Sequence, residues 1–210
     1  RALRIDVADR ASVDTAIDAC AQEFGGLDVM FANAGIDPGS HVLGPDGQRS
    51  EEGALENYDP AKWHKVIGIS LDGVFLCVRA ATRHMKPQGR GSIVITTSVS
   101  SVRATSIGIA YSAAKAGAAH FMRNAALELA RYGIRVNAIA PGPFVTNIGD
   151  GFVHNPQVQA AMASVIPMRR MGNVEEMKGL ALFLASPASS FMTGAELFND
   201  GGLSLGSPID

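Results

Sequence analysis

Tyr111, Lys115 and Ser98 could together protonate or deprotonate the oxygen of an alcohol or a ketone. Tyr111 and Lys115 lie four positions apart, so a helix would place both side chains on one face. A nearby ammonium favours the ionised form of a phenol and lowers its pKa from an ordinary value of about 10. Ser98 stands thirteen residues before Tyr111 and adds a hydroxyl. These residue types predict general acid/base chemistry.

Tyr58 and Lys62 have the same spacing, but no hydroxyl residue stands thirteen positions before Tyr58. Pro60 lies between them and suits the first turn of a helix, which leaves Tyr58 outside that helix. The residue thirteen positions before Tyr58 is Pro45, which has no hydroxyl. The spacing alone is therefore weak evidence, and the catalytic interpretation of Tyr111 depends on other parts of the chain.

Small and turn-forming residues follow two apolar runs, which we interpret as strands 27–32 and 134–140. They are Asn33, Ala34 and Gly35 after the first run and Pro141 and Gly142 after the second. In open α/β sheets the ligand crevice lies outside the carboxyl ends of the strands, where small residues let the backbone approach a cofactor. These residues therefore predict a cofactor site at the strand ends.

Strand-like runs alternate with stretches of helical period along the chain. This alternation predicts an α/β fold with a doubly wound, Rossmann-like parallel sheet in a single domain. The expected strands are 3–6, 27–32, 92–98, 134–140 and 196–199. The expected helices are 10–24, 60–85, 109–132, 156–165 and 174–185, and the second should stop before Pro87 and Gly89.

The composition is that of one soluble domain. The chain has 210 residues, of which 47% are apolar, and a formal net charge of −2. It can bury one substantial core and has no general attraction for nucleic acid. No apolar run is long enough to span a bilayer, and no signal peptide opens the chain. We therefore expect a cytoplasmic protein with no membrane partner.

Neither the cysteines nor the histidines indicate a metal site. Cys20 and Cys77 show no C-x-x-C spacing, and the five histidines show no i, i+4 metal spacing. We expect no metal and no disulfide framework.

Taken in order and at these spacings, the motifs resemble the short-chain dehydrogenase/reductase family over nearly the whole chain. The residues that carry the resemblance are Asp6, Val7, Asn33, Ala34, Gly35, Ser98, Tyr111, Lys115, Asn137, Pro141, Gly142, Thr146, Asn199, Asp200, Gly201 and Gly202. The resemblance implies an NAD(P)-dependent oxidoreductase that interconverts a secondary alcohol and a ketone by hydride transfer. It implies that Tyr111 is the acid/base, that Lys115 lowers its pKa, and that Ser98 polarises the substrate oxygen.

The resemblance also implies which residues bind the cofactor. They are Asp6 and Val7 beside the adenine, the backbone of Asn33, Ala34 and Gly35, Tyr111 and Lys115 at the nicotinamide ribose, and Pro141, Gly142 and Thr146 near the carboxamide. Asp6 could instead cap a turn, and Gly142 could serve only a bend. The strand end that usually selects between NAD and NADP is not in view, so both cofactors stay open.

A glycine-rich turn for the pyrophosphate, which follows the first strand of a doubly wound dinucleotide fold, does not occur in the sequence. If run 3–6 is the family's third strand, the first two strands of the family fold are absent and run 3–6 has no partner. We therefore expect residues 1–210 to be a dinucleotide-binding oxidoreductase domain that is incomplete at its N-terminus.

Ser70 departs from the family pattern, which usually has asparagine here to help hold a water that relays protons from the lysine. The serine hydroxyl could still support a water, and we expect Ser70→Asn to leave turnover similar or to raise it. This departure and the missing turn keep an alternative open, a non-catalytic nucleotide-binding or regulatory relative of the same fold.

Two segments bear on the substrate. The segment 37–58 is expected to be an inserted loop, and a solvated surface loop is an equally good interpretation. Its five acids against Arg49 give a formal charge of −4, which weakly opposes an acyl-carrier thioester; the acids are Asp37, Asp46, Glu51, Glu52 and Glu56. The segment 144–170 resembles the family's mobile substrate lid, and its apolar character suggests a nonpolar or alicyclic alcohol or ketone.

The oligomeric state is inferred only from the resemblance to the family. Helices 60–85 and 109–132 look like those by which related enzymes form dimers and tetramers. We therefore expect a homotetramer that acts on a small molecule.

Overall fold

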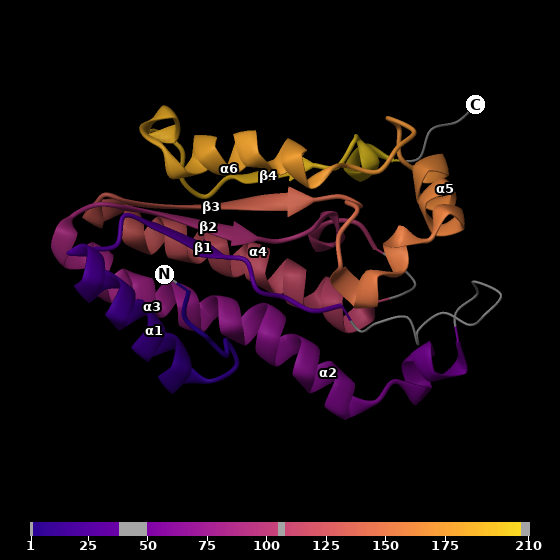
Figure 1. The fold of residues 1–210 in the computed structure, drawn as a ribbon, viewed down its shortest axis with the longest axis horizontal. Helices are drawn as coiled ribbons and strands as arrows, with labels where there is room; N and C mark the ends of the chain where they lie inside the picture. Colours follow the sequence, from indigo (N-terminus) through magenta and orange to yellow (C-terminus); the bar gives the residue numbers. More distant parts are fainter. Residues whose placement is uncertain (1, 38–49, 105–107, 207–210) are drawn as a thin grey trace.

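The computed structural model describes residues 2–37, 50–104 and 108–206. In these residues four parallel strands form one sheet in the order β1 (Val29–Ala32), β2 (Gly91–Thr96), β3 (Ile134–Pro141) and β4 (Glu196–Asn199). Helices cover both faces, with α3 (Gly73–Gln88) and α4 (Ile109–Leu129) on one side and α6 (Lys178–Ala185) on the other (Figure 1). The predicted doubly wound α/β class is confirmed.

The predicted strand 3–6 is wrong, because residues 2–6 have no regular structure in the described part of the chain. The side chains of Leu3 and Ile5 are 42% and 39% exposed. A strand is stable only where a neighbour accepts and donates its backbone hydrogen bonds, and the described sheet begins at β1. Instead, Asp6 caps a turn, since its carboxylate accepts a hydrogen bond from the Ala8 N–H at 3.0 Å.

Two helices, α1 and α5, begin after a residue whose side chain caps them. Helix α1 (Arg10–Phe24) is capped by the Asp9 carboxylate and ends at Gly25 in the left-handed conformation. Helix α5 (Pro156–Val165) follows the cap Asn155, with proline in its first turn. The predicted helix 174–185 is divided into a 3₁₀ turn, Val174–Met177, and α6.

The predicted helix 60–85 is longer than expected and contains an irregular turn. Helix α2 (Pro60–Ile67) passes through a π-helical turn, Gly68–Asp72, directly into α3. Pro87 lies inside the last turn of α3, and the helix ends at Gly89, whose φ is 67°. The π-helical turn contains Ser70, and such turns are frequent at functional sites.

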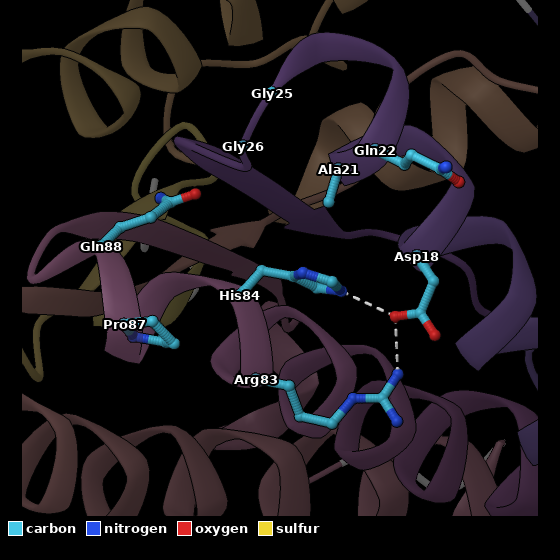
Figure 2. A pocket seen from close by; sticks show the side chains of 9 residues that line it. All are labelled: Asp18, Ala21, Gln22, Gly25, Gly26, Arg83, His84, Pro87 and Gln88. Carbon is cyan, nitrogen blue, oxygen red and sulfur yellow. Dashed lines mark hydrogen bonds and ion pairs between the residues drawn. The ribbon is translucent and has the colours of Figure 1, made fainter.

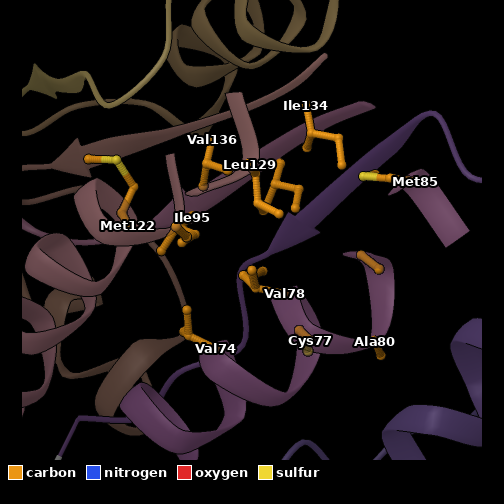
Figure 3. Packing of buried hydrophobic residues seen from close by; sticks show 14 of the residues in the cluster. Val74, Cys77, Val78, Ala80, Met85, Ile95, Met122, Leu129, Ile134 and Val136 are labelled. Carbon is orange, nitrogen blue, oxygen red and sulfur yellow. The ribbon is translucent and has the colours of Figure 1, made fainter. Parts of the chain in front are cut away.

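The main core lies between the sheet and the helices α3 and α4, as Figure 3 shows. Its buried side chains from these elements include Val74, Val78, Met85, Ile95, Met122, Leu129, Ile134 and Val136. Helix α4 adds buried alanines, among them Ala118 and Ala126, which let its backbone approach the sheet. This packing holds the N-terminal end of α4, which carries Tyr111 and Lys115, in a fixed position over the ends of the strands.

Gly133 lies in the turn between α4 and β3, where its backbone packs closely against that of Gly89. Its φ is +70°, and a Cβ added to it would lie 2.4 Å from the Gly89 carbonyl oxygen. Gly25 has nearly the same φ, +72°, but an added Cβ would meet nothing within 4 Å. We expect Gly25→Ala to lower the free energy of unfolding by about 1 kcal/mol through strain alone, and Gly133→Ala by about 3 kcal/mol. Urea unfolding followed by circular dichroism measures both, and equal losses would contradict this account.

Candidate active site

Ser98 and Tyr111 meet at the carboxyl end of β2. Ser98 follows the strand by two residues, and its hydroxyl accepts a hydrogen bond from the Ser100 N–H at 3.1 Å. Tyr111 stands in the first turn of α4, which begins after Gly108 in the left-handed conformation. The side chains of Ser98 and Tyr111 are hydrogen-bonded. The structure therefore brings together the two hydroxyls that the sequence predicts to act on one oxygen.

Lys115 lies one turn further along α4, with its side chain buried at 3% exposure. Its Nζ donates a hydrogen bond to the Thr96 carbonyl oxygen at 2.6 Å and lies 5.5 Å from the centre of the Tyr111 ring. Burial disfavours the ammonium and lowers the pKa of Lys115 from 10.5 to about 8. An ammonium has three N–H donors, so this group can also bind polar atoms of a ligand.

Gly35 passes directly against this lysine. A Cβ added to Gly35 would lie 3.2 Å from Lys115 Nζ and 3.5 Å from Ser70 Oγ. The fully buried Ser70 hydroxyl accepts a hydrogen bond from the Ile36 N–H at 3.1 Å and donates one to the Ile36 carbonyl oxygen at 3.3 Å. Ser70 thus ties the π-helical turn to the segment after β1. The expected effect of Ser70→Asn stays a prediction, and a large loss of kcat would show that these hydrogen bonds give the serine a role of its own.

Asn33 adds a contact between neighbouring strand ends. Its side-chain oxygen accepts a hydrogen bond from the Thr96 hydroxyl at 2.8 Å. Asn33 and Ala34 are both exposed where β1 ends. The carboxyl ends of β1 and β2 are therefore joined directly, with accessible backbone beside them.

The ionisation of Tyr111 differs from the prediction. Burial raises the pKa of its phenol, the carboxylate of Asp37 raises it further, and the hydrogen bond from Ser98 opposes both effects. A lowering by Lys115 is not among the causes of this shift. In the structure the phenol is therefore held protonated at neutral pH, in the form that can donate a proton.

The end of β3 brings a second group of predicted residues to the same edge of the sheet. Pro141 ends the strand, and the Gly142 N–H donates to the Asn199 carbonyl oxygen at 3.0 Å. A Cβ on Gly142 would lie 2.6 Å from the Asp200 Cα, so this close approach by itself requires glycine. The Thr146 hydroxyl accepts a hydrogen bond from the Ile148 N–H at 3.3 Å.

A cavity of about 170 Å³ opens beside this strand end. It is lined by Phe144, Met168, Asn199 and Gly201, among others. Phe144 and Met168 belong to the segment predicted to be a lid.

Asp6 and Val7 have local roles at the start of the described chain. Asp6 caps its own turn, which is the simpler of the two interpretations of this residue. Val7 packs against the first residue of α3, since a Cβ on Gly73 would lie 3.0 Å from Val7 Cγ2. A role for these two residues beside adenine stays a prediction.

Another cavity, of about 340 Å³, lies between α1 and α3 at the opposite edge of the sheet (Figure 2). Gly26 and Gln88 line it just before β1 and β2 begin. In it the Asp18 carboxylate pairs with His84 at 2.6 Å and with Arg83 at 2.8 Å. Because it lies at the starts of the strands, we do not assign it to the chemistry of Ser98 and Tyr111.

The residues at the carboxyl ends of the strands fit a nicotinamide dinucleotide. A Cβ on Gly35 would come within 3.2 Å of Lys115 Nζ, so the Gly35 backbone and the ammonium lie close together and present polar groups at one place. Exposed Asn33 and Ala34 continue this surface, which suits a ligand with ribose hydroxyls.

Two residues of this site could not be found from the catalytic motif. Thr96 acts through its carbonyl oxygen, which carries no side-chain signal. Asp37 interacts electrostatically with Tyr111, and its only signal in the sequence is its place just after the strand end.

The buried lysine predicts a dependence of stability on pH. Between pH 8 and 10.5 folded Lys115 has lost a proton that the unfolded chain keeps, so the stability of the native protein rises with pH across this window. Lys115→Met lacks this contribution. We expect the wild type to gain about 3 kcal/mol relative to Lys115→Met between pH 7 and pH 10.5, by about 1.4 kcal/mol for each pKa unit. Urea unfolding at several pH values measures the difference, and a difference independent of pH would contradict the burial of a titrating ammonium.

Within the described ranges no group of three His, Cys, Asp or Glu side chains is placed to hold a metal ion. No helix in the described part of the chain is both long and apolar enough to cross a membrane.

Comparison with known proteins extends over nearly the whole chain. A family model described as Enoyl-(Acyl carrier protein) reductase matches residues 1–204. Cis-4-hydroxycyclohexanecarboxylate dehydrogenase of Sinomonas cyclohexanicum is 42% identical over 200 residues, covering 95% of this chain and 75% of that protein. 3beta-hydroxysteroid dehydrogenase 1 of Eggerthella lenta is 37% identical over 205 residues, covering 97% and 74%. The crystal structure of a gluconate 5-dehydrogenase from Burkholderia cenocepacia in complex with NADP and tartrate has a TM-score of 0.84 at 35% identity, covering 96% and 74%.

These matches confirm the predicted fold class and the predicted nicotinamide-dependent oxidoreductase activity at the level of the family. They do not test the individual site residues, whose roles rest on the geometry above. The chain belongs to the short-chain dehydrogenase/reductase family.

Proposed function

We propose that this chain interconverts a secondary alcohol and a ketone with NAD or NADP, and that Tyr111, Ser98 and Lys115 carry the acid/base steps. The observation that supports this most is the hydrogen-bonded pair of Ser98 and Tyr111 with a buried ammonium beneath the phenol ring. When bound, the nicotinamide cofactor supplies or accepts the hydride.

Each residue has one task in the direction of reduction. The Tyr111 hydroxyl donates its proton to the substrate oxygen as negative charge develops there, and the Ser98 hydroxyl donates a hydrogen bond to the same atom. The raised pKa of Tyr111 keeps the phenol protonated for this step. The phenolate that remains is stabilised by the Lys115 ammonium, 5.5 Å from the ring centre. In oxidation the same groups act in reverse, and the remaining N–H donors of Lys115 bind the ribose.

The substrate is a nonpolar or alicyclic alcohol or ketone. Support comes from the segment 144–170, whose Val153, Met162 and Ile166 share an apolar cluster with Val99, the neighbour of Ser98. We propose that this segment is the substrate lid. Two relatives are named for alicyclic alcohols, a hydroxycyclohexanecarboxylate and a hydroxysteroid.

The expected inserted loop 37–58 falls largely outside the described residues, which omit 38–49. Its described part forms two 3₁₀ turns, Glu51–Gly53 and Leu55–Asn57. The acids Glu51, Glu52 and Glu56 are exposed there, and their charge disfavours an acyl-carrier thioester.

The alternative of a regulatory, non-catalytic relative makes a different prediction. Such a protein would bind reduced nicotinamide tightly, as seen by fluorescence, and would turn over none of a panel of ketones. The paired hydroxyls of Ser98 and Tyr111 favour the enzyme.

Tyr111→Phe tests the catalytic role directly. We expect kcat to fall at least about 100-fold because the proton donor is lost, while binding of the reduced cofactor, measured by fluorescence, is retained. Tyr132→Phe is the matched control, since Tyr132 lies at the far end of α4, stacked with Lys86 and Arg131. Initial rates with a cyclic ketone check both variants. Full turnover by Tyr111→Phe would contradict the proposed role.

A homotetramer in the cytoplasm is the remaining part of the proposal. Phe75 on α3 and Leu127 on α4 are 47% and 84% exposed, which suits helices that pack against another copy. Light scattering at micromolar concentration should give the mass of four chains, and Leu127→Glu should reduce it. Leu205→Glu, at a residue 91% exposed outside these helices, should leave the mass unchanged. A monomer in the wild type would contradict this assembly.

A further inference from the structure

A buried carboxylate on β4 has no part in the acid/base steps or in the binding of the nicotinamide ribose. The side chain of Glu196 is only 4% exposed, although β4 is an edge strand of the described sheet. Glutamate is depleted in strands, and it is almost never fully buried unless it is paired. An apolar side chain would pack at this position without the cost of desolvating a charge. The partners of the carboxylate therefore indicate its role.

The Glu196 carboxylate joins two other elements of the structure to β4. Its Oε1 atom accepts a hydrogen bond from the Ser101 hydroxyl at 2.6 Å, and its Oε2 atom accepts one from the Arg123 guanidinium at 2.9 Å. Hydrogen bonds to a charged group are shorter and stronger than those between neutral groups. Ser101 ends the 3₁₀ turn Val99–Ser101, and Arg123 lies on α4. One side chain of β4 therefore holds both this turn and α4.

The 3₁₀ turn continues directly from Ser98. The Ser98 carbonyl oxygen accepts a hydrogen bond from the Ser101 N–H at 2.9 Å. On the strand side of Ser98, the Thr97 N–H donates to the Ile139 carbonyl oxygen of β3 at 2.8 Å. Ser98 is therefore held by β3 through the residue before it, and by Glu196 through the turn after it.

Arg123 connects the same carboxylate to the helix of Tyr111. Both residues lie on α4, which runs without a break from Ile109 to Leu129. Because a helix moves as a rigid element, the contact between Arg123 and Glu196 restrains the helix that carries Tyr111. The two elements that supply the proposed catalytic hydroxyls are thus fixed to one buried group.

We propose that Glu196 is a positioning residue for the reaction, and that its contacts with Ser101 and Arg123 set the position of the Ser98 hydroxyl relative to the Tyr111 hydroxyl. This inference rests on the proposed function and adds to it a residue that acts through Ser101 and Arg123. A displacement of about 1 Å in a catalytic group can cost about 100-fold in rate. Loss of Glu196 should therefore slow the reaction and leave cofactor binding intact.

Glu196→Val and Ser101→Ala test this role in the full-length protein with reduced cofactor and a cyclic ketone. We expect each variant to lower kcat at least about fivefold, while the affinity for reduced cofactor, measured by fluorescence, changes less than about twofold. Glu196→Gln still offers an amide oxygen to the Ser101 hydroxyl, so it should retain most of kcat.

Thermal melting separates positioning from a purely structural role. The melting temperature of Glu196→Val should fall by less than about 3 °C, because Arg123 is 48% exposed and can be hydrated when its partner is lost. A larger fall together with an unchanged kcat would show that Glu196 serves stability alone. Ser101→Ala removes a single hydroxyl and tests the same contact if Glu196→Val does not fold.

A Ser98→Ala background gives a readout that a structural role would not change. If Glu196 acts by positioning the Ser98 hydroxyl, Glu196→Val or Ser101→Ala should lower the rate less than about twofold once that hydroxyl is absent. Single-turnover measurements with enzyme in excess of reduced cofactor record the slow residual rates.

Glu128→Val is the matched control. Glu128 also pairs with a cation of another element, Lys86 at 3.1 Å, but it is 63% exposed and lies at the far end of α4. Its kcat should equal that of the wild type, because a surface ion pair at that place restrains neither hydroxyl.

The outcomes distinguish this inference from the proposed function. Three results would overturn the positioning role and leave the proposed function intact: unchanged kcat in Glu196→Val and Ser101→Ala, an equal loss in Glu128→Val, or a loss as large in the Ser98→Ala background as in the wild type. No turnover of any cyclic ketone by the wild type, or wild-type rates in both Ser98→Ala and Tyr111→Phe, would contradict the proposed function itself.

Discussion

The hydrogen bond from Lys115 Nζ to the Thr96 carbonyl oxygen is the contact on which the candidate site depends. It joins the first turns of α4 to the carboxyl end of β2. Tyr111 lies one turn before Lys115, and Ser98 lies two residues after Thr96. One contact between helix and strand therefore sets the relative position of the two hydroxyls. Burial of the charged ammonium costs free energy because the group loses its hydration. This desolvation lowers the pKa of Lys115.

The surroundings of Lys115 explain why this costly arrangement can persist. Gly35 leaves room for the ammonium, and the Ser70 hydroxyl holds the adjoining backbone through both polar atoms of Ile36. Beneath them, the alanine-rich face of α4 packs closely on the sheet. The close-packed core stabilises the fold, so that a few polar groups at the strand ends can be arranged for chemistry rather than for stability.

The sequence predicted those parts of the molecule that local chemistry controls. Apolar periodicity located β1 to β4 and the main helices, and the spacing of Ser98, Tyr111 and Lys115 identified residues that the fold brings together. The prediction of strand 3–6 failed because the apolar pattern of a segment does not show whether a neighbouring strand is present to pair with its backbone. Two features depend on tertiary packing and cannot be predicted from the apolar periodicity of the sequence. They are the π-helical turn at Ser70 and the continuation of α3 beyond Pro87. The ionisation of Tyr111 could not be predicted from Lys115 alone, because burial and Asp37 act on it from other elements.

A crystal structure of the full-length protein with NADH or NADPH and an unreactive analogue of a cyclic ketone tests the central claim most directly. The account predicts that the hydroxyls of Ser98 and Tyr111 both lie within hydrogen-bonding distance of the analogue's oxygen. It also predicts that Lys115, while bound to the Thr96 carbonyl, reaches the nicotinamide ribose. An analogue bound away from the ends of β2 and β3, or a Lys115 side chain turned out to solvent, would contradict it.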